Sequence, residues 1–130
     1  MISEAIFNAV ADVCRGEPRV AAAYLLGSRA AGTARPGSDL DVALLPVRGT
    51  DLDARARVAL GTELSFRCGL DADVGVLSSR NLVYAREAVL KGLRAYAADP
   101  GYADFMEMTF LSMYGQYNDD RRELLHAFAV

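Results

Sequence analysis

The pattern of apolar and polar positions along the chain predicts helices that alternate with short strands. Apolar residues recur at helical spacing over residues 3–15, with Ser3 placed to cap the helix and Gly16 placed to end it. The run over residues 20–26 is continuously apolar and lies between Pro18 and a glycine, which is typical of a buried strand. The N-terminal part of the chain therefore predicts one helix followed by one strand.

The rest of the chain continues this alternation. It predicts strands at residues 40–45, 71–77 and 93–96. It predicts helices that begin at Thr50, which with Asp53 resembles a capping box, at Ser79, and at Asp99-Pro100. We therefore expect a single α/β (α+β) domain over residues 1–130, with a small mixed sheet, flanking helices and a helical C-terminal region.

Length, charge and cysteine usage remove several classes of function. A chain of 130 residues is long enough for one domain of common size, but too short for a catalytic domain plus a full substrate-binding domain. Its 14 basic and 17 acidic side chains leave a net charge of −3, which gives no general electrostatic case for direct nucleic-acid binding. Two distant cysteines and a single histidine argue against a zinc site or a histidine-based triad.

The N-terminal segment and the hydropathy pattern bear on location. Glu4 and Asp12 fall in a segment without a basic run, which argues against a signal peptide. No apolar run approaches the roughly 18 residues that a transmembrane helix needs. We therefore expect a protein of the reducing cytoplasm that has no association with membranes.

The most informative residues lie between the first two predicted strands. Gly27-Ser28 follows the first strand, and ten residues later the second begins with Asp39-Leu40-Asp41. Residues two apart share a face of a strand, so the two aspartates are expected to project together while Leu40 points to the core. This spacing lets two carboxylates converge on a divalent cation.

A third carboxylate is available on the next predicted strand. Alternation puts Asp71 and Asp73 on one face, and the residues alone leave the choice between them open. Three clustered carboxylates repel one another and bind protons unless a cation compensates their charge. Magnesium is suited to this task because it takes oxygen ligands and commonly bridges carboxylates to phosphates.

The turn at Gly27-Ser28 supplies a second part of the expected site. Glycine lets the backbone approach a ligand closely, and N–H groups at such a turn or helix start can hold a polyphosphate. Together, the turn and the carboxylates favour phosphoryl-type transfer, in which positioning and charge neutralisation supply most of the catalysis.

The arrangement Gly27-Ser28-x10-Asp39-x-Asp41 resembles the signature of the DNA polymerase β-type nucleotidyltransferase superfamily. The order of elements resembles its minimal nucleotidyltransferases, the MntA-type antitoxins that are paired with HEPN-domain HepT toxins. The resemblance is carried by the string GSRAAGTARPGSDLDVAL and continues through ADVGVL and LKGLRAYAADPGYADF. One departure is Val76, where the family strand often carries a second acid that is not one of the three ligands.

The resemblance implies a nucleotidyltransferase fold and a role for particular residues. The Mg²⁺ ligands and catalytic groups that it implies are Asp39, Asp41 and Asp73, so it favours Asp73 over Asp71. The nucleotide-binding residues that it implies are Gly27, Ser28 and Ser38. It further implies transfer of AMP from ATP to a tyrosine of a HepT-like toxin, which silences that toxin.

Two other functions remain open on the sequence alone. A nucleotidyltransferase that modifies a small molecule, such as an antibiotic, would share the same site, although such enzymes usually carry an additional C-terminal domain. A non-catalytic antitoxin would retain the fold without needing all three acids, so their presence in this chain counts against it.

The segment over residues 102–117 carries large apolar side chains around most of its helical circumference. Such a helix either packs on two sides within the domain or presents an apolar face to a partner, here the toxin or a second copy of the chain. Burial of Phe105, Met108 and Leu111 inside a single chain would decide for the first possibility.

Overall fold

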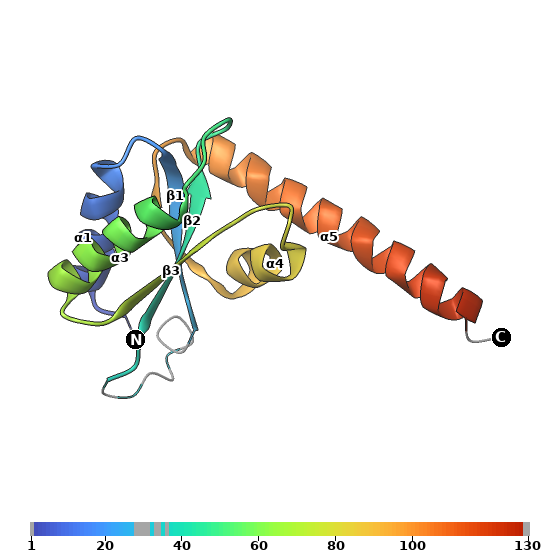
Figure 1. The fold of residues 1–130 in the computed structure, drawn as a ribbon, viewed down its shortest axis with the longest axis horizontal. Coiled ribbons are helices and arrows are strands. Elements are labelled where there is room, and N and C mark those ends of the chain that lie inside the picture. Colours follow the sequence, from blue (N-terminus) through green and yellow to red (C-terminus); the bar gives the residue numbers. More distant parts are fainter. Residues whose placement is uncertain (1, 28–31, 33–34, 36, 129–130) are drawn as a thin grey trace.

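This computed structural model describes residues 2–27, 32, 35 and 37–128. Within them, four strands form one sheet in the order β3-β2-β1-β4, and four helices flank it (Figure 1). The strands are β1 (Val20–Leu26), β2 (Leu40–Pro46), β3 (Ala72–Val76) and β4 (Leu93–Ala97). The helices are α1 (Glu4–Arg15), α3 (Ala54–Cys68), α4 (Leu82–Lys91) and α5 (Pro100–Phe128).

The sheet is mixed, as we expect for a nucleotidyltransferase fold. β1 lies antiparallel to both β2 and β4, whereas β2 and β3 are parallel. A parallel pair needs a long crossover connection, and α3 provides it between β2 and β3. The predicted α/β architecture with a C-terminal helix is therefore confirmed, with strand ends that differ from the predicted ones by at most one residue.

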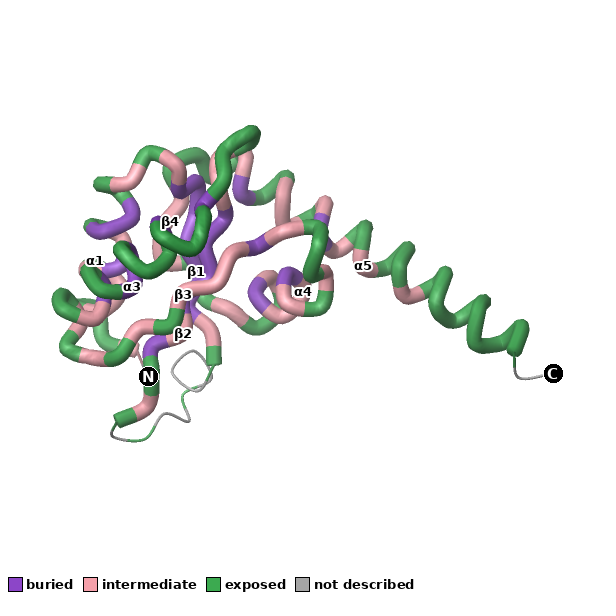
Figure 2. The backbone as a smooth tube through the Cα atoms, viewed as in Figure 1, coloured by how far each residue is buried: buried purple, intermediate pink, exposed green. Residues whose placement is uncertain are grey.

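Apolar side chains cover both faces of the central strands, which explains why β1 and β2 are almost continuously hydrophobic. On one face, Leu25 and Leu44 belong to the core beneath α1 and α3. On the other face, Tyr24 and Leu45 belong to a second core beneath α4 and α5. Figure 2 shows this burial concentrated in the sheet and in the inner sides of the surrounding helices.

Two predicted helix starts are wrong by two or three residues. The N-cap of α3 is Asp53, whose side chain accepts a hydrogen bond from a backbone N–H of the first turn, whereas the Thr50 hydroxyl donates to the carbonyl of Val47 at 2.6 Å. The N-cap of α4 is Asn81, and not Ser79. In both places several cap-forming residues are close in sequence, and the path of the preceding loop decides which one caps the helix.

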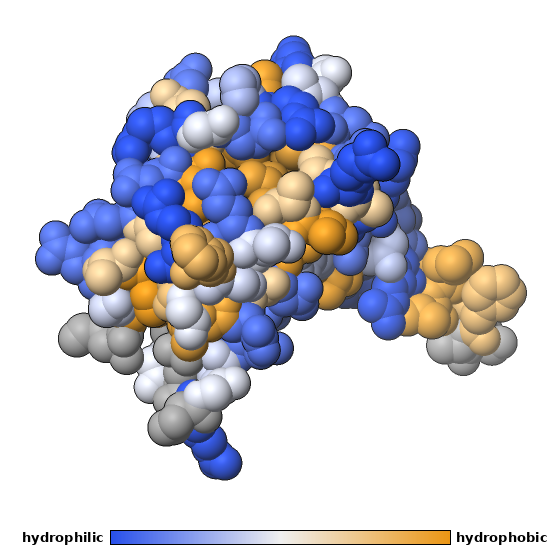
Figure 3. All heavy atoms as spheres, turned by 60° about the vertical axis from the view of Figure 1, so that its left-hand side comes forward, coloured by the Kyte–Doolittle hydropathy of each residue, from blue (hydrophilic) through white to orange (hydrophobic). Residues whose placement is uncertain are grey.

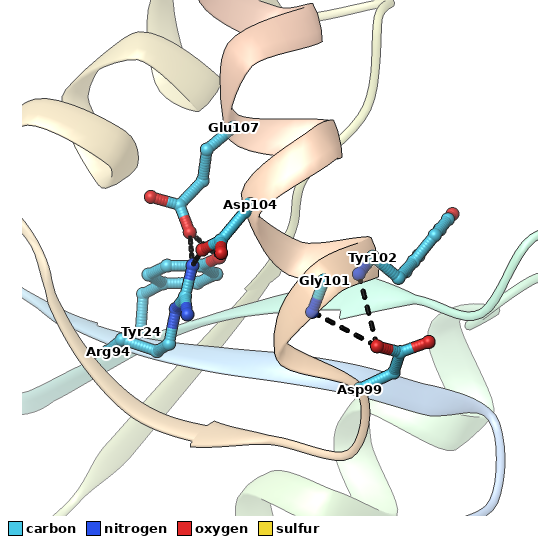
Figure 4. Close-up of polar contacts among 7 residues, drawn as sticks. All are labelled: Tyr24, Arg94, Asp99, Gly101, Tyr102, Asp104 and Glu107. Atoms are coloured by element: carbon cyan, nitrogen blue, oxygen red, sulfur yellow. Dashed lines mark hydrogen bonds and ion pairs between the residues drawn. The ribbon is translucent and has the colours of Figure 1, made fainter.

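The predicted start of the last helix is confirmed. Asp99 caps α5, and its carboxylate accepts hydrogen bonds from the backbone N–H groups of Gly101 and Tyr102 at 3.0 and 3.3 Å (Figure 4). Pro100 occupies the first helical position, where its missing N–H costs nothing because that group has no partner inside a helix.

A polar cluster fixes the first turns of α5 to the sheet, and we call Tyr24, Arg94, Asp104 and Glu107 the anchor cluster (Figure 4). Arg94 of β4 pairs with Glu107 and, at 2.7 Å, with Asp104, both on α5. The hydroxyl of Tyr24 in β1 donates to Glu107 at 2.9 Å. The cluster therefore joins two strands to one helix with one positive and two negative charges.

The far half of α5 leaves the body of the molecule (Figures 1 and 2). Ala103 and Phe110 are its buried residues in the described part of the chain, and both lie in its first half. Phe105 and Met108 are 49% and 68% exposed, so of the two possibilities that the sequence left open, packing on two sides within one chain does not occur. The described helices include none that is long and apolar enough to cross a membrane.

Candidate active site at the β2–β3 boundary

A cleft of about 600 Å³ opens where β3 meets α4. Leu26 and Gly27 at the end of β1 and Asp41 in β2 form one part of its wall, and residues 73–76 of β3 form another. Polar side chains from the helices complete the lining, and they are Arg57, Asn81, Tyr84, Glu87 and Lys91. The cleft therefore collects residues from three strands and two helices.

Two of the three predicted acids face each other in this cleft. Asp41 and Asp73 are direct neighbours in the parallel register of β2 and β3, so their side chains leave the sheet on the same face. Leu40, next to Asp41, is fully buried on the opposite face, as alternation predicts. Neighbouring strands lie about 4.8 Å apart, which brings the two carboxylates within reach of one cation.

The electrostatics of Asp41 show that this negative charge is uncompensated. Burial raises the pKa of the Asp41 carboxyl above its ordinary value, and the nearby charges of Asp73 and then Asp39 raise this pKa further. A raised pKa means that the protein disfavours the ionised form of the group. Bound positive charge would relieve this penalty.

Asp39 lies beside the cleft. It is an exposed residue immediately before β2, and it is near enough to Asp41 to affect the pKa of that carboxyl. Among the described residues, no three acidic, histidine or cysteine side chains are already gathered closely enough to hold a metal ion. We call Asp39, Asp41 and Asp73 the carboxylate cluster, in which two members meet and the third stands next to them.

Asp71 takes a different place from Asp73. Its carbonyl oxygen accepts a hydrogen bond from the N–H of Leu40 at 2.7 Å, and it precedes β3 as an exposed residue. In the described chain it does not line the cleft, whereas Asp73 does. The structure thus puts Asp73 beside Asp41, in the register that the resemblance favours.

The glycine of the predicted phosphate turn makes room for Asp41. Gly27 has a φ of 72°, a conformation that side chains disfavour, and a Cβ at this position would overlap the Asp41 carboxylate. Ser28 lies outside the described residues. Ser38 closes a turn with Arg35, because its hydroxyl accepts from the Arg35 N–H at 2.9 Å and its own N–H donates to the Arg35 carbonyl at 3.0 Å.

Sequence reasoning missed Tyr84, which comes from α4 and packs over β3. Its hydroxyl lies where a Cβ at residue 75 would be, so Gly75 is required for this contact. Burial raises the pKa of the Tyr84 hydroxyl, and the charges of Asp41 and Asp73 raise it further. The alternation pattern of β3 does not reveal this partner, because only the packing of α4 brings it there.

Sequence reasoning also missed the basic residues of the cleft. Arg57 lies in the first turn of α3 and Lys91 at the end of α4, and both are exposed. Lys91 also pairs with Glu87 one helical turn earlier, at 3.3 Å. These side chains place positive charge in the lining of the cleft that also contains Asp41 and Asp73.

Comparison with known proteins identifies a family and a relative that this chain resembles. The model of the family described as "Polymerase beta, Nucleotidyltransferase" matches residues 8–100. The protein adenylyltransferase MntA of Shewanella oneidensis is 29% identical over 108 residues, which cover 83% of this chain and 76% of that protein.

Solved structures show the same fold. A toxin–antitoxin structure with AMP-PNP matches with a TM-score of 0.78 and 25% identity, covering 95% of this chain and 98% of the other. A tri-AMPylated Shewanella oneidensis HEPN toxin in complex with MNT antitoxin matches with a TM-score of 0.73 and 22% identity, over 96% and 97% of the two chains. Because the family model covers well over half of its residues, the chain belongs to the polymerase beta nucleotidyltransferase family.

Proposed function

We propose that this chain is a protein adenylyltransferase that transfers AMP from ATP to a tyrosine hydroxyl of a HEPN-type toxin and so acts as its antitoxin. The observation that carries the proposal is the placement of Asp41 and Asp73 side by side in a cleft next to Gly27. The relative named protein adenylyltransferase and the solved complex of an AMPylated HEPN toxin support the choice of acceptor. The proposed unit is a single nucleotidyltransferase domain over residues 1–130.

The residues of the cleft fit a magnesium ion. Mg²⁺ is usually held by one or two carboxylates together with substrate phosphates and water, and two facing carboxylates with an unrelieved charge provide this donor set. Asp41 and Asp73 would hold the ion, with Asp39 joining them from beside the cleft. When bound, Mg²⁺ would supply charge neutralisation on the triphosphate of ATP.

The remaining site residues orient the nucleotide in this proposal. Gly27 and Ser28 hold the β- and γ-phosphates with backbone N–H groups, as glycine-containing turns after a strand commonly do. Ser38 keeps the turn before Asp39 closed, which fixes where the carboxylate cluster begins. Arg57 and Lys91 provide positive charge toward the phosphates from the helices.

The proposed reaction is an in-line displacement at the α-phosphorus of ATP. The tyrosine oxygen of the acceptor attacks this phosphorus, and the bond from it to the oxygen bridging to the β-phosphate breaks. Asp73 accepts the hydroxyl proton as the new ester bond forms. The products are the AMP ester of the tyrosine and pyrophosphate, so atoms and charge balance.

The exposed apolar face of α5 is the proposed contact with the toxin or with a second copy of the chain. The large side chains within residues 102–117 that it leaves exposed are Phe105, Met108, Met113 and Tyr117. Burial of apolar area contributes about 25 cal/mol per Å², so this face would supply much of the affinity.

A cytoplasmic location stays a prediction. The proposed use of ATP and the two free cysteine thiols both suit the reducing cytoplasm.

A transfer assay tests the proposed function. Purified chain is incubated with ATP labelled at the α-phosphate, Mg²⁺ and the Shewanella oneidensis HEPN toxin as acceptor, and label on the toxin is measured with and without chelator. We expect Mg²⁺-dependent labelling that Asp73→Asn abolishes and that Asp71→Asn, a matched control two residues away, leaves intact. Equal labelling by both variants, or none by the unaltered chain, would refute the proposal.

A further inference from the structure

β3 is an edge strand whose outer side is open next to the carboxylate cluster. In the sheet order β3-β2-β1-β4, β2 is the one strand beside β3 among the residues that the structure describes. The N–H of Leu40 bonds to the carbonyl of Asp71, and the N–H of Leu77 bonds to the carbonyl of Leu44. Because strand residues alternate, odd-numbered residues of β3 direct their main-chain groups toward β2 and even-numbered ones direct them outward.

The even-numbered residues of β3 do not share the same environment. The N–H of Ala72 donates to the hydroxyl of Ser65 in α3 at 2.9 Å, so α3 covers the beginning of the strand. Val74 and Val76 follow as half-buried residues, and their outward N–H and carbonyl groups have no hydrogen-bond partner in the part of the chain that the structure describes. This leaves a regular row of donors and acceptors beginning one residue after Asp73.

The other edge of the sheet is less suited to pairing. The register of β4 with β1 shifts between Ala23 and Tyr24, whereas β3 follows β2 without a break from Ala72 to Val76. β4 also carries Arg94, which is engaged in the anchor cluster. Bulges and charges are the features that keep edge strands from adding partners, and β3 lacks both at Val74 and Val76.

Hollows lie on both faces of the sheet at β3, where the side chains of an added strand would point. The cleft described above lies on the α4 side, and a second hollow of about 570 Å³ lies on the α3 side, with Asp73 and Val74 lining both. In Figure 1, β3 passes between α3 and α4 with neither helix in front of it. Figure 3 shows apolar atoms in the recessed middle of the face that comes forward, surrounded by hydrophilic side chains.

We propose that the acceptor protein binds by adding an extended, tyrosine-bearing segment to the outer edge of β3, with main-chain hydrogen bonds to Val74 and Val76. This inference rests on the proposed function, because it explains how a protein tyrosine reaches Asp73. Strand addition fixes the register through main-chain bonds and leaves the side chains to fill pockets on alternate faces. It therefore identifies the partner class as an extended peptide segment.

The register of the added strand determines where its tyrosine lies. A residue opposite Asp73 points to the same face of the sheet as Asp73 and Asp41 and comes from a strand about 4.8 Å away. Its neighbours in sequence point to the α3 side, where Val74 packs against Gly61. A single register thus brings the acceptor hydroxyl to the carboxylate cluster while the flanking side chains enter the second hollow.

Hydrogen exchange tests the docking directly in the unaltered chain. The amides of Val74 and Val76 face outward, so we expect them to exchange rapidly in the isolated chain and to become protected when the Shewanella oneidensis HEPN toxin is added. Protection that is confined to α5 would overturn the proposal. A different result would be protection of the Val74 and Val76 amides in a concentrated sample without toxin, together with a dimer in sedimentation. It would overturn the proposal, because a second copy of the chain would then occupy the edge of β3.

A proline substitution separates the main-chain bonds from the side chains. Val76→Pro removes an outward N–H without removing a bond to β2, and proline is tolerated at such edge positions. Val76→Ala is the matched control, because it shortens the side chain and keeps the N–H. We expect Val76→Pro to raise KM for the HEPN toxin about tenfold and Val76→Ala to change it little.

A small acceptor distinguishes failure of the docking from failure of the enzyme. N-acetyltyrosinamide has no extended chain to pair with β3, so any rise in KM of Val76→Pro over Val76→Ala with this acceptor measures an effect on the cleft, and we expect the rise with the toxin to exceed it about tenfold. Equal KM values of the two Val76 variants for the toxin would overturn the docking proposal alone. Absence of AMP transfer by the unaltered chain to either acceptor would overturn the proposed function and this inference with it.

Discussion

The molecule gathers charge in two places that have opposite character. The carboxylate cluster brings like charges to the β2–β3 boundary, and the pKa of Asp41 is raised by burial and by the other two acids. The anchor cluster sets Arg94 between two acids of α5, and the pKa of Arg94 is raised by its hydrogen bonds to Glu107 and Asp104. In an acid a raised pKa disfavours the charged form, whereas in a base it favours the charged form.

The difference indicates which cluster serves the fold and which serves binding. Charges that satisfy one another within the chain hold α5 against β1 and β4, so the anchor cluster is complete by itself. The carboxylate cluster lacks compensation among its own members and therefore lowers stability until a cation binds. Substitutions in the carboxylate cluster should accordingly reduce activity, whereas substitutions in the anchor cluster should reduce stability.

The largest expected effect is on activity. Asp41→Asn keeps the shape of the side chain and removes one of the two facing charges, so we expect AMP transfer to fall about 10³-fold, corresponding to several kcal/mol of lost electrostatic stabilisation. Transfer of α-labelled AMP and the thermal unfolding midpoint are measured on the same sample. A variant that loses activity because it has unfolded would contradict the assignment of this cluster to catalysis.

Arg94→Met should have the opposite effect, because it should lower stability and leave nucleotide binding unchanged. It leaves Glu107 and Asp104 without their positive partner, so we expect the free energy of unfolding to fall by about 1–2 kcal/mol, discounted for partial exposure of the cluster. Denaturant unfolding measures this loss, and calorimetry measures the affinity for Mg²⁺ and ATP together, which should stay unchanged. A weakened affinity would show that the anchor cluster contributes to nucleotide binding.

The pH dependence of stability sharpens the comparison further. Because the pKa of Asp41 is higher in the folded state, the fold loses stability as pH rises from the ordinary aspartate value through this raised pKa. Asp41→Asn should therefore have a higher Tm than the unaltered chain at neutral pH without Mg²⁺, and this gain should vanish in acid. A gain that is independent of pH would mean that charge repulsion is not its cause.

Asp104→Asn should cause the smallest of these changes, a slight loss in the free energy of unfolding. The Asp104 side chain is 70% exposed, compared with 24% for Glu107, so its ion pair with Arg94 is screened by water. We expect a loss of at most about 0.5 kcal/mol in the free energy of unfolding. Glu107→Gln, which also weakens the bond from Tyr24, should cost more, and equal losses would argue against exposure as the deciding factor.

The two central strands, β1 and β2, could be predicted because both of their faces are buried. The uninterrupted apolar run of β1 needs no partner to be recognised, and the alternation around Leu40 correctly directs Asp41 away from the core. Helix starts were less predictable. Thr50 and Ser79 are both suitable cap residues, and only the course of the loops shows that Asp53 and Asn81 take this role instead.

The candidate site was predictable where it lies on strands or at Gly27, directly after β1. Asp41 and Asp73 follow from strand alternation and the family motif, and the register brings them together. Tyr84 and Arg57 enter the cleft from helices whose packing angle leaves no local signal in the sequence. The outward-facing groups of β3 belong to the main chain, so no pattern of side chains could reveal them.

The pairing of β1 affects how the chain folds during its synthesis. Ala22 pairs with Leu45 on one side and with Ala97 on the other, so the central strand gains its second neighbour only after most of the sequence has left the ribosome. Non-local strand pairing is slow because a long loop must close first. Until β4 and α5 arrive, the nascent chain exposes the apolar face around Tyr24, and this intermediate is the one most exposed to aggregation or to a chaperone.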